Sequence, residues 1–127
     1  TKQLPLVVAL ETRRDSVYLQ SFAPDGSVLN EPSSRTLDQA KEELSKQSTV
    51  VAGDAASRIV SAMGKAEKNE QALVIESVTG PDAVFVAEIA AGRWSGAAAP
   101  GSGRPLTPLY IQPPEAKRPV AGGRLRS

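Results

Sequence analysis

Two adjacent arginines, Arg13 and Arg14, and a nearby tyrosine, Tyr18, are the side chains whose types and spacing best suit a binding function. An arginine guanidinium offers a planar fork of donors that fits the oxygens of a phosphate or a carboxylate. The three residues could therefore contact RNA phosphates or the carboxylates of a protein partner. Surface arginines are more often solvated or weakly paired, however, and Glu11 or Asp15 could supply the pairing charge. Both interpretations stay open from the sequence.

Gly53-Asp54 and the segment 109–111 are two further candidates, and each has a structural alternative. A turn that leads into a helix can hold an anion, but Asp54 brings negative charge there and one glycine is not a phosphate loop. We therefore expect Asp54 to cap the helix that follows. The Leu-Tyr-Ile of 109–111 could be a docking strip, but such residues more often complete a core. Trp94 could anchor a partner or cover the end of a helix.

Several kinds of chemistry are excluded, because the sequence contains no histidine and no cysteine. Disulfides, Ser-His-Asp and Cys-His nucleophile systems, and most zinc and copper sites all need these residues. The carboxylates Asp38, Glu42 and Glu43 have spacings that suit a solvated helix face, and they form no convincing acid-base pair. We therefore expect no catalytic residue, no metal site and no cofactor.

Length and composition bound the fold and the surroundings of the protein. The 127 residues are enough for one domain, and with only 4% aromatic residues the core must be built from Val, Leu, Ile and Ala. A net charge of +1 gives no global field for nucleic acid or an acidic partner. The lack of cysteine suits a reducing compartment, and no run of about 18 apolar residues could span a membrane, so we expect a cytoplasmic protein. The chain begins at Thr1 and not at Met, so we expect part of a longer protein.

The arginine pair lies in a turn between two predicted strands. Leu6–Leu10 is apolar at every position, which predicts a central strand buried on both faces. Residues 17–22 mix β-branched and aromatic with polar side chains and are expected to pair with it. Asp25-Gly26 predicts a second tight turn that leads into a short third strand at Val28-Leu29. Residues 30–35 are expected to form a loop.

Three helices and two more strands are predicted downstream. Thr36 and Gln39 form a capping-box pattern, which predicts a helix over about 37–47, with Leu37, Ala40 and Leu44 on its apolar side. Two further strands are predicted at 49–52 and 72–75. The second helix runs from Asp54 to Gly64, and its apolar side holds Ala56, Ile59, Val60 and Met63. The third helix is opened by Gly80-Pro81-Asp82 and ends at Gly92, and its apolar side holds Phe85, Val86, Ile89 and Ala90.

The resulting order, β-β-β-α-β-α-β-α, predicts an α/β fold with a mixed five-stranded sheet. The later strands should be parallel, joined by right-handed crossovers, and the first strands add antiparallel partners. This is the layout of one half of an actin/Hsp70-like (ribonuclease H-like) domain. We expect a single α/β domain over 1–117 and a disordered basic tail over 118–127.

Three short motifs resemble the bacterial TsaB (YeaZ) family. Residues 10–18, LETRRDSVY, are similar to its hairpin "D-A-R-R-G-E-V-Y", and residues 108–117, PLYIQPPEAK, to its C-terminal "P-L-Y-L-R-P-P-D-A-K". Residues 51–56, VAGDAA, resemble its central "V-x-G-x-G-A". The hairpin departs from the pattern, since Asp15-Ser16 replaces Gly-Glu and Glu11 replaces Asp, so its turn type can differ.

TsaB proteins have two such halves, and the resemblance covers the second half only. The first half, with its "D-T-S" strand and "G-P-G-S-F-T-G" loop, is missing. The resemblance implies a role in forming N6-threonylcarbamoyladenosine at position 37 of tRNA. In that glycoprotease-like family TsaB is a non-enzymatic scaffold that supports the TsaD transferase, joined by the TsaE ATPase. The expected partners are therefore TsaD-like and TsaE-like proteins and a second copy in a homodimer, with tRNA indirectly, and Arg13, Arg14 and Tyr18 are the candidate contacts.

Two alternatives from other classes stay open. The chain could be half of a nucleotide-dependent or peptidase-like enzyme whose cleft forms against an absent half. It could also be a self-associating module, because a missing half would leave an apolar face open. Binding of ATP by the chain alone would favour the enzyme.

Overall fold

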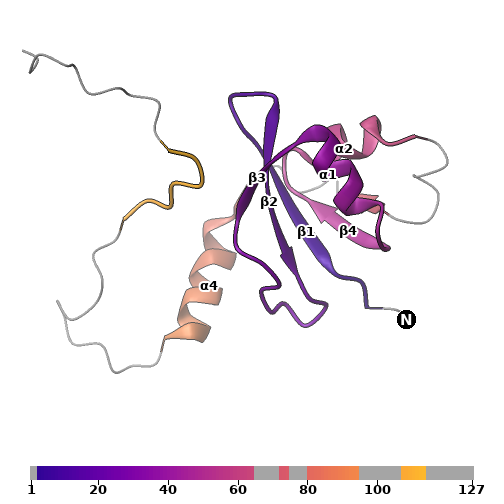
Figure 1. Cartoon of the computed structure of the whole chain (residues 1–127). Coiled ribbons are helices and arrows are strands. Elements are labelled where there is room, and N and C mark those ends of the chain that lie inside the picture. Colours follow the sequence, from indigo (N-terminus) through magenta and orange to yellow (C-terminus); the bar gives the residue numbers. More distant parts are fainter. Residues whose placement is uncertain (1–2, 65–71, 75–79, 95–106, 114–127) are drawn as a thin grey trace, which may run out of the picture.

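A computed structural model (Figure 1) describes residues 3–64, 72–74, 80–94 and 107–113. The strands are β1 (Leu6–Glu11), β2 (Ser16–Phe22), β3 (Ser33–Thr36), β4 (Thr49–Ala52) and β5 (Ala72–Val74), and the helices are α1 (Leu37–Leu44), α2 (Ala56–Ala62) and α4 (Ala83–Arg93). The expected tail over 118–127 and the small-residue stretch that precedes residue 107 lie outside the described residues.

The strands form one mixed sheet in the order β3-β2-β1-β4-β5. β1 pairs antiparallel with β2 and parallel with β4, while β4 pairs parallel with β5. Figure 1 shows α1 and α2 side by side over one face of this sheet. The predicted α/β class with a mixed sheet is thus confirmed.

The central strand β1 is buried on one face and not, as expected, on both. Val7 and Ala9 are buried, whereas Leu6 and Val8 are half-buried and Leu10 is 42% exposed. Side chains alternate between the faces of a strand, so the buried set is the one that points toward α1 and α2. The unbroken apolar run of Leu6–Leu10 predicted a central strand, but it could not show whether the face away from α1 and α2 is covered.

The core lies between the sheet and helices α1 and α2. Its largest fully buried side chains come from four different elements: Val17, Leu44, Val51 and Ile59. The apolar faces predicted for both helices are confirmed, since Ala40, Leu44, Ala56, Ile59 and Met63 are buried and Leu37 and Val60 pack beside them.

The third strand lies at Ser33–Thr36, so its prediction at Val28-Leu29 was wrong, and the loop predicted over 30–35 ends at Pro32. Val28 makes only an isolated bridge with Phe22. Asn30 interrupts the pairing, because its side-chain oxygen accepts the N–H of Ser21 at 2.9 Å, which a third strand would otherwise accept. The chain rejoins the edge of β2 only after Pro32.

The turn at Asp25-Gly26 is present as predicted, with Gly26 at φ 84°. The Asp25 carboxylate accepts the hydroxyl of Ser27 at 2.6 Å and its N–H at 2.9 Å. These hydrogen bonds hold the pKa of Asp25 below its ordinary value. The turn therefore closes by side-chain as well as backbone contacts.

Helix α1 begins with the predicted capping box. Gln39 donates its N–H to the Thr36 hydroxyl at 3.2 Å, and the Gln39 side chain accepts the N–H of Thr36 at 3.0 Å. The helix ends at Leu44, before the expected residue 47. Residues 45–47, which were predicted to form its last turn, include no buried side chain, so packing against the core does not stabilise that turn.

Helix α4 lies where the third helix was predicted, but its apolar side chains are exposed. Asp82 caps it by accepting the N–H of Val84 at 2.8 Å, so Pro81 precedes the cap and does not lie in the first turn. Phe85 is 62% exposed and Ile89 is 55% exposed. The helix also runs past Gly92, where it was expected to end, to Arg93. None of the described helices is both long and apolar enough to cross a membrane.

Gly53, between β4 and α2, brings the backbone unusually close to β1. It has φ 109°, and a Cβ at this position would lie 2.1 Å from the carbonyl oxygen of Ala9. The same oxygen accepts the N–H of Ala55 at 3.2 Å. Only glycine satisfies both the positive φ and the close approach.

We predict that Gly53→Ala destabilises the protein far more than Gly26→Ala. Both residues have positive φ, which costs a β-carbon residue about 1 kcal/mol. At Gly26 a Cβ meets nothing within 4 Å, whereas at Gly53 it collides with the Ala9 carbonyl. Urea denaturation measures both variants, and equal losses of stability would contradict the described packing.

We also predict that Val7→Asp prevents folding whereas Val8→Asp gives a folded, less stable protein. Val7 is only 5% exposed, and an unpaired carboxylate buried there is strongly destabilising. Val8 is half-buried on the face away from α1 and α2, where water can reach the new group. Circular dichroism during heating distinguishes the two, and a cooperative transition for Val7→Asp would contradict the assignment of faces.

Candidate functional site

The turn between β1 and β2 is held by the hydroxyl of Thr12. Its Oγ1 accepts the N–H of Arg14 at 3.1 Å and donates to the carbonyl oxygen of Ser16 at 2.8 Å. Arg13, Arg14 and Asp15 are therefore carried on an ordered turn, where all three are exposed. No non-glycine residue of the described chain has a positive φ, so Asp15 occupies this turn without a left-handed backbone.

Strand β3 adds Ser34 and Arg35 beside this turn. Val17 pairs with Arg35 and Tyr18 pairs with Ser34 across the antiparallel ladder. Paired residues share a face, so Arg35 lies on the same side as buried Val17 and the helices, where its Nε is 3.8 Å from Glu43. Tyr18 and Ser34 lie on the opposite face.

Gln112 joins the C-terminal segment 107–113 to that opposite face. It donates its side-chain N–H to the Ser34 hydroxyl at 2.7 Å, and its side-chain oxygen accepts the Tyr18 hydroxyl at 3.4 Å. The expectation that 109–111 completes the core was largely wrong, since Leu109 is 74% exposed and Tyr110 is 69% exposed. The contact depends on polar Gln112, which the sequence analysis did not single out although it lies within the PLYIQPP motif.

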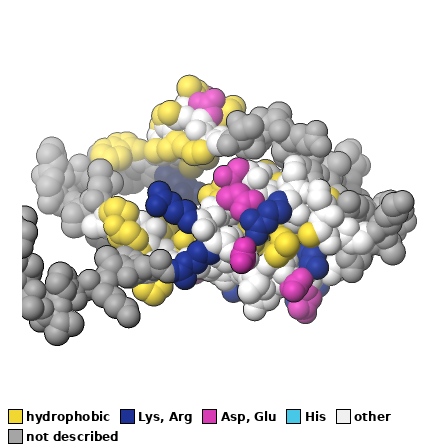
Figure 2. Space-filling view, turned by 90° about the horizontal axis from the view of Figure 1, so that it is seen from above, with side chains coloured by type: hydrophobic (Ala, Val, Ile, Leu, Met, Phe, Trp, Pro, Cys, Tyr) yellow, Lys and Arg dark blue, Asp and Glu magenta, His cyan; other side chains and the backbone are white. Residues whose placement is uncertain are grey.

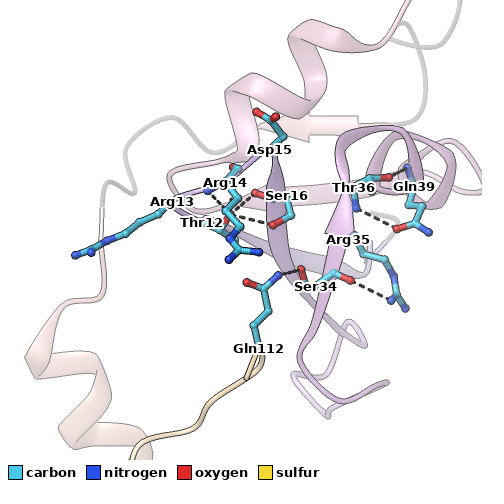
Figure 3. Close-up of a pocket in the computed structure, with 10 residues that line it drawn as sticks. All are labelled: Thr12, Arg13, Arg14, Asp15, Ser16, Ser34, Arg35, Thr36, Gln39 and Gln112. Atoms are coloured by element: carbon cyan, nitrogen blue, oxygen red, sulfur yellow. Dashed lines mark hydrogen bonds between the residues drawn. The ribbon is translucent and has the colours of Figure 1, made fainter. Parts of the chain in front are cut away.

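Two adjoining hollows open at this end of the sheet. The larger, of about 870 Å³, is lined by polar and charged side chains, drawn in Figure 3: Thr12, Arg13, Arg14, Asp15, Ser16, Ser34, Arg35, Thr36, Gln39 and Gln112. The smaller, of about 560 Å³, is lined by Glu11, Thr12, Arg13, Arg14, Tyr18, Gln112 and Pro113. In Figure 3 the Arg14 side chain points toward Gln112 and Ser34, whereas Arg13 extends away from the fold.

The structure therefore brings all three predicted contact residues to one place. Arg13, Arg14 and Tyr18 line the smaller hollow, and the two arginines also line the larger. Arg35 was missed, because only its register beside β2 places it there. Arginine forks, hydroxyls and a side-chain amide are donors, and together they can bind an oxyanion.

The charges around the hollows are partly committed to other partners. Glu11, which could have paired with the arginines of the turn, forms an ion pair with Arg58 at 2.5 Å. Asp15 is the one carboxylate among the residues that line the larger hollow, and three arginines line it as well. Figure 2, which views the molecule from above, shows dark blue and magenta side chains gathered next to one another on this face.

Asp54 ties α2 to the end of β1 and does not cap α2 as predicted. Its carboxylate accepts the N–H of Glu11 at 2.8 Å, and the N-cap of α2 is Ala55, without a side-chain cap bond. Gly53 and Asp54 thus join two elements of the core. Trp94, another candidate, is 66% exposed after the end of α4 and lines neither hollow. Among the described residues, no three acidic side chains gather as a metal site would need.

We predict that Thr12→Val loosens the turn whereas Thr12→Ser leaves it nearly intact. Valine keeps the shape but removes the hydrogen bonds to Arg14 and Ser16, and each such bond contributes about 1 kcal/mol. Serine keeps the hydroxyl. Guanidinium denaturation gives the stabilities, and amide hydrogen exchange at residues 13–16 gives the local effect. Equal exchange in the two variants would show that the hydroxyl does not order the turn.

Comparison with known proteins shows a similarity of fold. No family model and no curated protein matches the chain. The chain is similar to the crystal structure of an uncharacterized protein with similarity to peptidase YeaZ from Pseudomonas aeruginosa, with a TM-score of 0.60 and 13% identity. The match covers 87% of this chain and 50% of that one, so the chain spans about half the length of the structure it matches. It is consistent with the YeaZ-like fold that the motifs predicted and fits part of an actin/Hsp70-like fold.

Proposed function

We propose that this chain is the second half of a TsaB-like scaffold in the complex that forms N6-threonylcarbamoyladenosine at position 37 of tRNA. The observation that carries the proposal is a YeaZ-like fold over 87% of the chain, together with the family-like motifs. Its partners would be a TsaD-like transferase and a TsaE-like ATPase in the cytoplasm, met through the full-length protein, with a homodimer as a further assembly.

The positions of the three motifs support this proposal. Residues 10–18 form the β1–β2 turn, residues 51–56 form the junction of β4 and α2, and residues 108–113 lie against β2 and β3. The hydrogen bond between Glu11 and Asp54 joins the first motif to the second. That between Tyr18 and Gln112 joins the first to the third. Segments that resemble one family in sequence therefore meet in space.

The proposed role is to hold other components and not to catalyse. The hollows at the β1–β2 turn present donors and positive charge, which suit binding of an anionic group. A second candidate, half of a nucleotide-dependent or peptidase-like enzyme, is favoured by the name given to the structural neighbour, which refers to a peptidase. In that case the cleft would need a second half to complete it.

We predict that deleting the coding region for residues 1–117 in the host abolishes or strongly reduces N6-threonylcarbamoyladenosine in tRNA. A scaffold is needed for assembly, so its loss should stop the modification although it does no chemistry. Mass spectrometry of tRNA nucleosides measures the change, and the wild-type gene should restore it. Normal modification in the deletion strain would contradict the proposal.

Titration calorimetry with ATP separates scaffold from enzyme. If the chain is a scaffold, we expect no tight binding of ATP by the isolated chain. Tight binding, accompanied by hydrolysis of the nucleotide, would favour the enzyme instead.

A further inference from the structure

We propose that the two hollows at the β1–β2 turn form one binding site for single-stranded RNA, in which the larger takes a backbone phosphate and the smaller takes a base. This inference goes beyond the scaffold role and depends on the chemistry of the site. The scaffold role and the RNA site can therefore each be wrong while the other holds.

The larger hollow has the chemistry of a phosphate site. Arg13, Arg14 and Arg35 line it against one carboxylate, Asp15. Guanidinium forks match phosphate oxygens, and hydroxyls such as that of Ser34 supply further donors of the kind that contact nucleic-acid backbones. Small-molecule pockets are mostly apolar and bury most of their ligand. This hollow is polar and open, which suits one phosphate of a longer chain.

The smaller hollow has the chemistry of a base-stacking site. Tyr18 and Pro113 line it, and the Tyr18 hydroxyl donates to the side-chain oxygen of Gln112 at 3.4 Å. Unpaired RNA bases stack on aromatic rings, whereas bases inside a duplex are not free to do so. Glu11 also lines this hollow, but its carboxylate is paired with Arg58.

The two hollows are contiguous, because Thr12, Arg13, Arg14 and Gln112 line both. A phosphate site directly beside an aromatic site matches one nucleotide, while an acidic peptide would need only the positive charge. Between the phosphate and the base of RNA lies the 2′-hydroxyl, which both donates and accepts hydrogen bonds. The amide of Gln112 lines both hollows, and beyond its bonds to Ser34 and Tyr18 it has a second N–H and a second oxygen lone pair for hydrogen bonds to the 2′-hydroxyl. The geometry therefore favours single-stranded RNA over DNA and over an acidic protein segment.

Fluorescence anisotropy with a fluorescein-labelled, unstructured RNA of about twelve nucleotides tests the phosphate site. The double variant Arg13→Gln/Arg14→Gln should bind at least tenfold more weakly at low salt. For every phosphate that the variant no longer neutralises, the slope of log K against log salt should also become shallower by about 0.7. At about 0.15 M salt, where charges more than about 8 Å apart are largely screened, Lys46→Gln, which removes a positive charge outside both hollows, should leave the affinity within about twofold. The double variant lies on an exposed turn, so it remains informative if other variants fold poorly.

A second pair of variants tests the base site. Tyr18→Phe keeps the aromatic ring and should retain most of the affinity, whereas Tyr18→Leu should weaken binding about fivefold or more. Circular dichroism checks that each variant is folded. If Tyr18→Leu does not fold, the affinity of Tyr18→Phe and of the arginine variant still decides the outcome.

Three results would overturn the proposal. If Lys46→Gln weakens binding as much as the double arginine variant does, the RNA responds to charge alone. If a blunt RNA duplex or the same sequence as DNA binds equally well, the site does not select single-stranded RNA. If a polyglutamate peptide binds more tightly with the same dependence on Arg13 and Arg14, the site serves an acidic protein partner. Normal tRNA modification in the deletion strain would contradict the scaffold role but would leave the result of the RNA-binding experiment unchanged.

Discussion

The close approach of the Gly53 backbone to the Ala9 carbonyl is the constraint on which the rest of the structure depends. It allows β4 to lie parallel to β1 and turn at once into α2, which covers the core. The same turn places the Asp54 carboxylate against the N–H of Glu11, the last residue of β1. The end of β1, and with it the turn that carries the arginines, is thereby fixed to the core and not only to β2.

Local patterns predicted the elements that local chemistry determines. The capping box of Thr36 and Gln39 specifies where α1 begins, and the apolar spacing of both packed helices specifies their buried faces. Strand β3 could not be predicted in this way, because its sequence, Ser-Ser-Arg-Thr, is polar and becomes a strand only by pairing with the edge of β2. The side chain of Asn30, which replaces a strand partner of Ser21, likewise acts through a contact that no local pattern shows.

The residues of the candidate site also fall into two groups, those that a local sequence pattern indicated and those that only the tertiary fold brings together. Arg13, Arg14 and Tyr18 could be found from the sequence, since they flank one turn and share one motif. Gln112 could not, because it is 78 residues from Ser34 and 94 residues from Tyr18, and only the tertiary fold brings it to both. Site residues contributed by register or by a distant segment carry no signal of their own, so the sequence indicated the turn but not the two hollows around it.

The electrostatics explain how a nearly neutral chain can offer a basic site. The net charge is +1, so no long-range field draws in an anion. Some charges of the fold are neutralised in pairs: Asp38 pairs with Lys41 at 2.8 Å, and Glu11, which lines the smaller hollow, pairs with Arg58. Arg35 is only 3.8 Å from Glu43, a contact that a phosphate could compete with. Three arginines and one carboxylate line the larger hollow, so binding there must come from short-range contacts whose strength depends on the geometry of the β1–β2 turn.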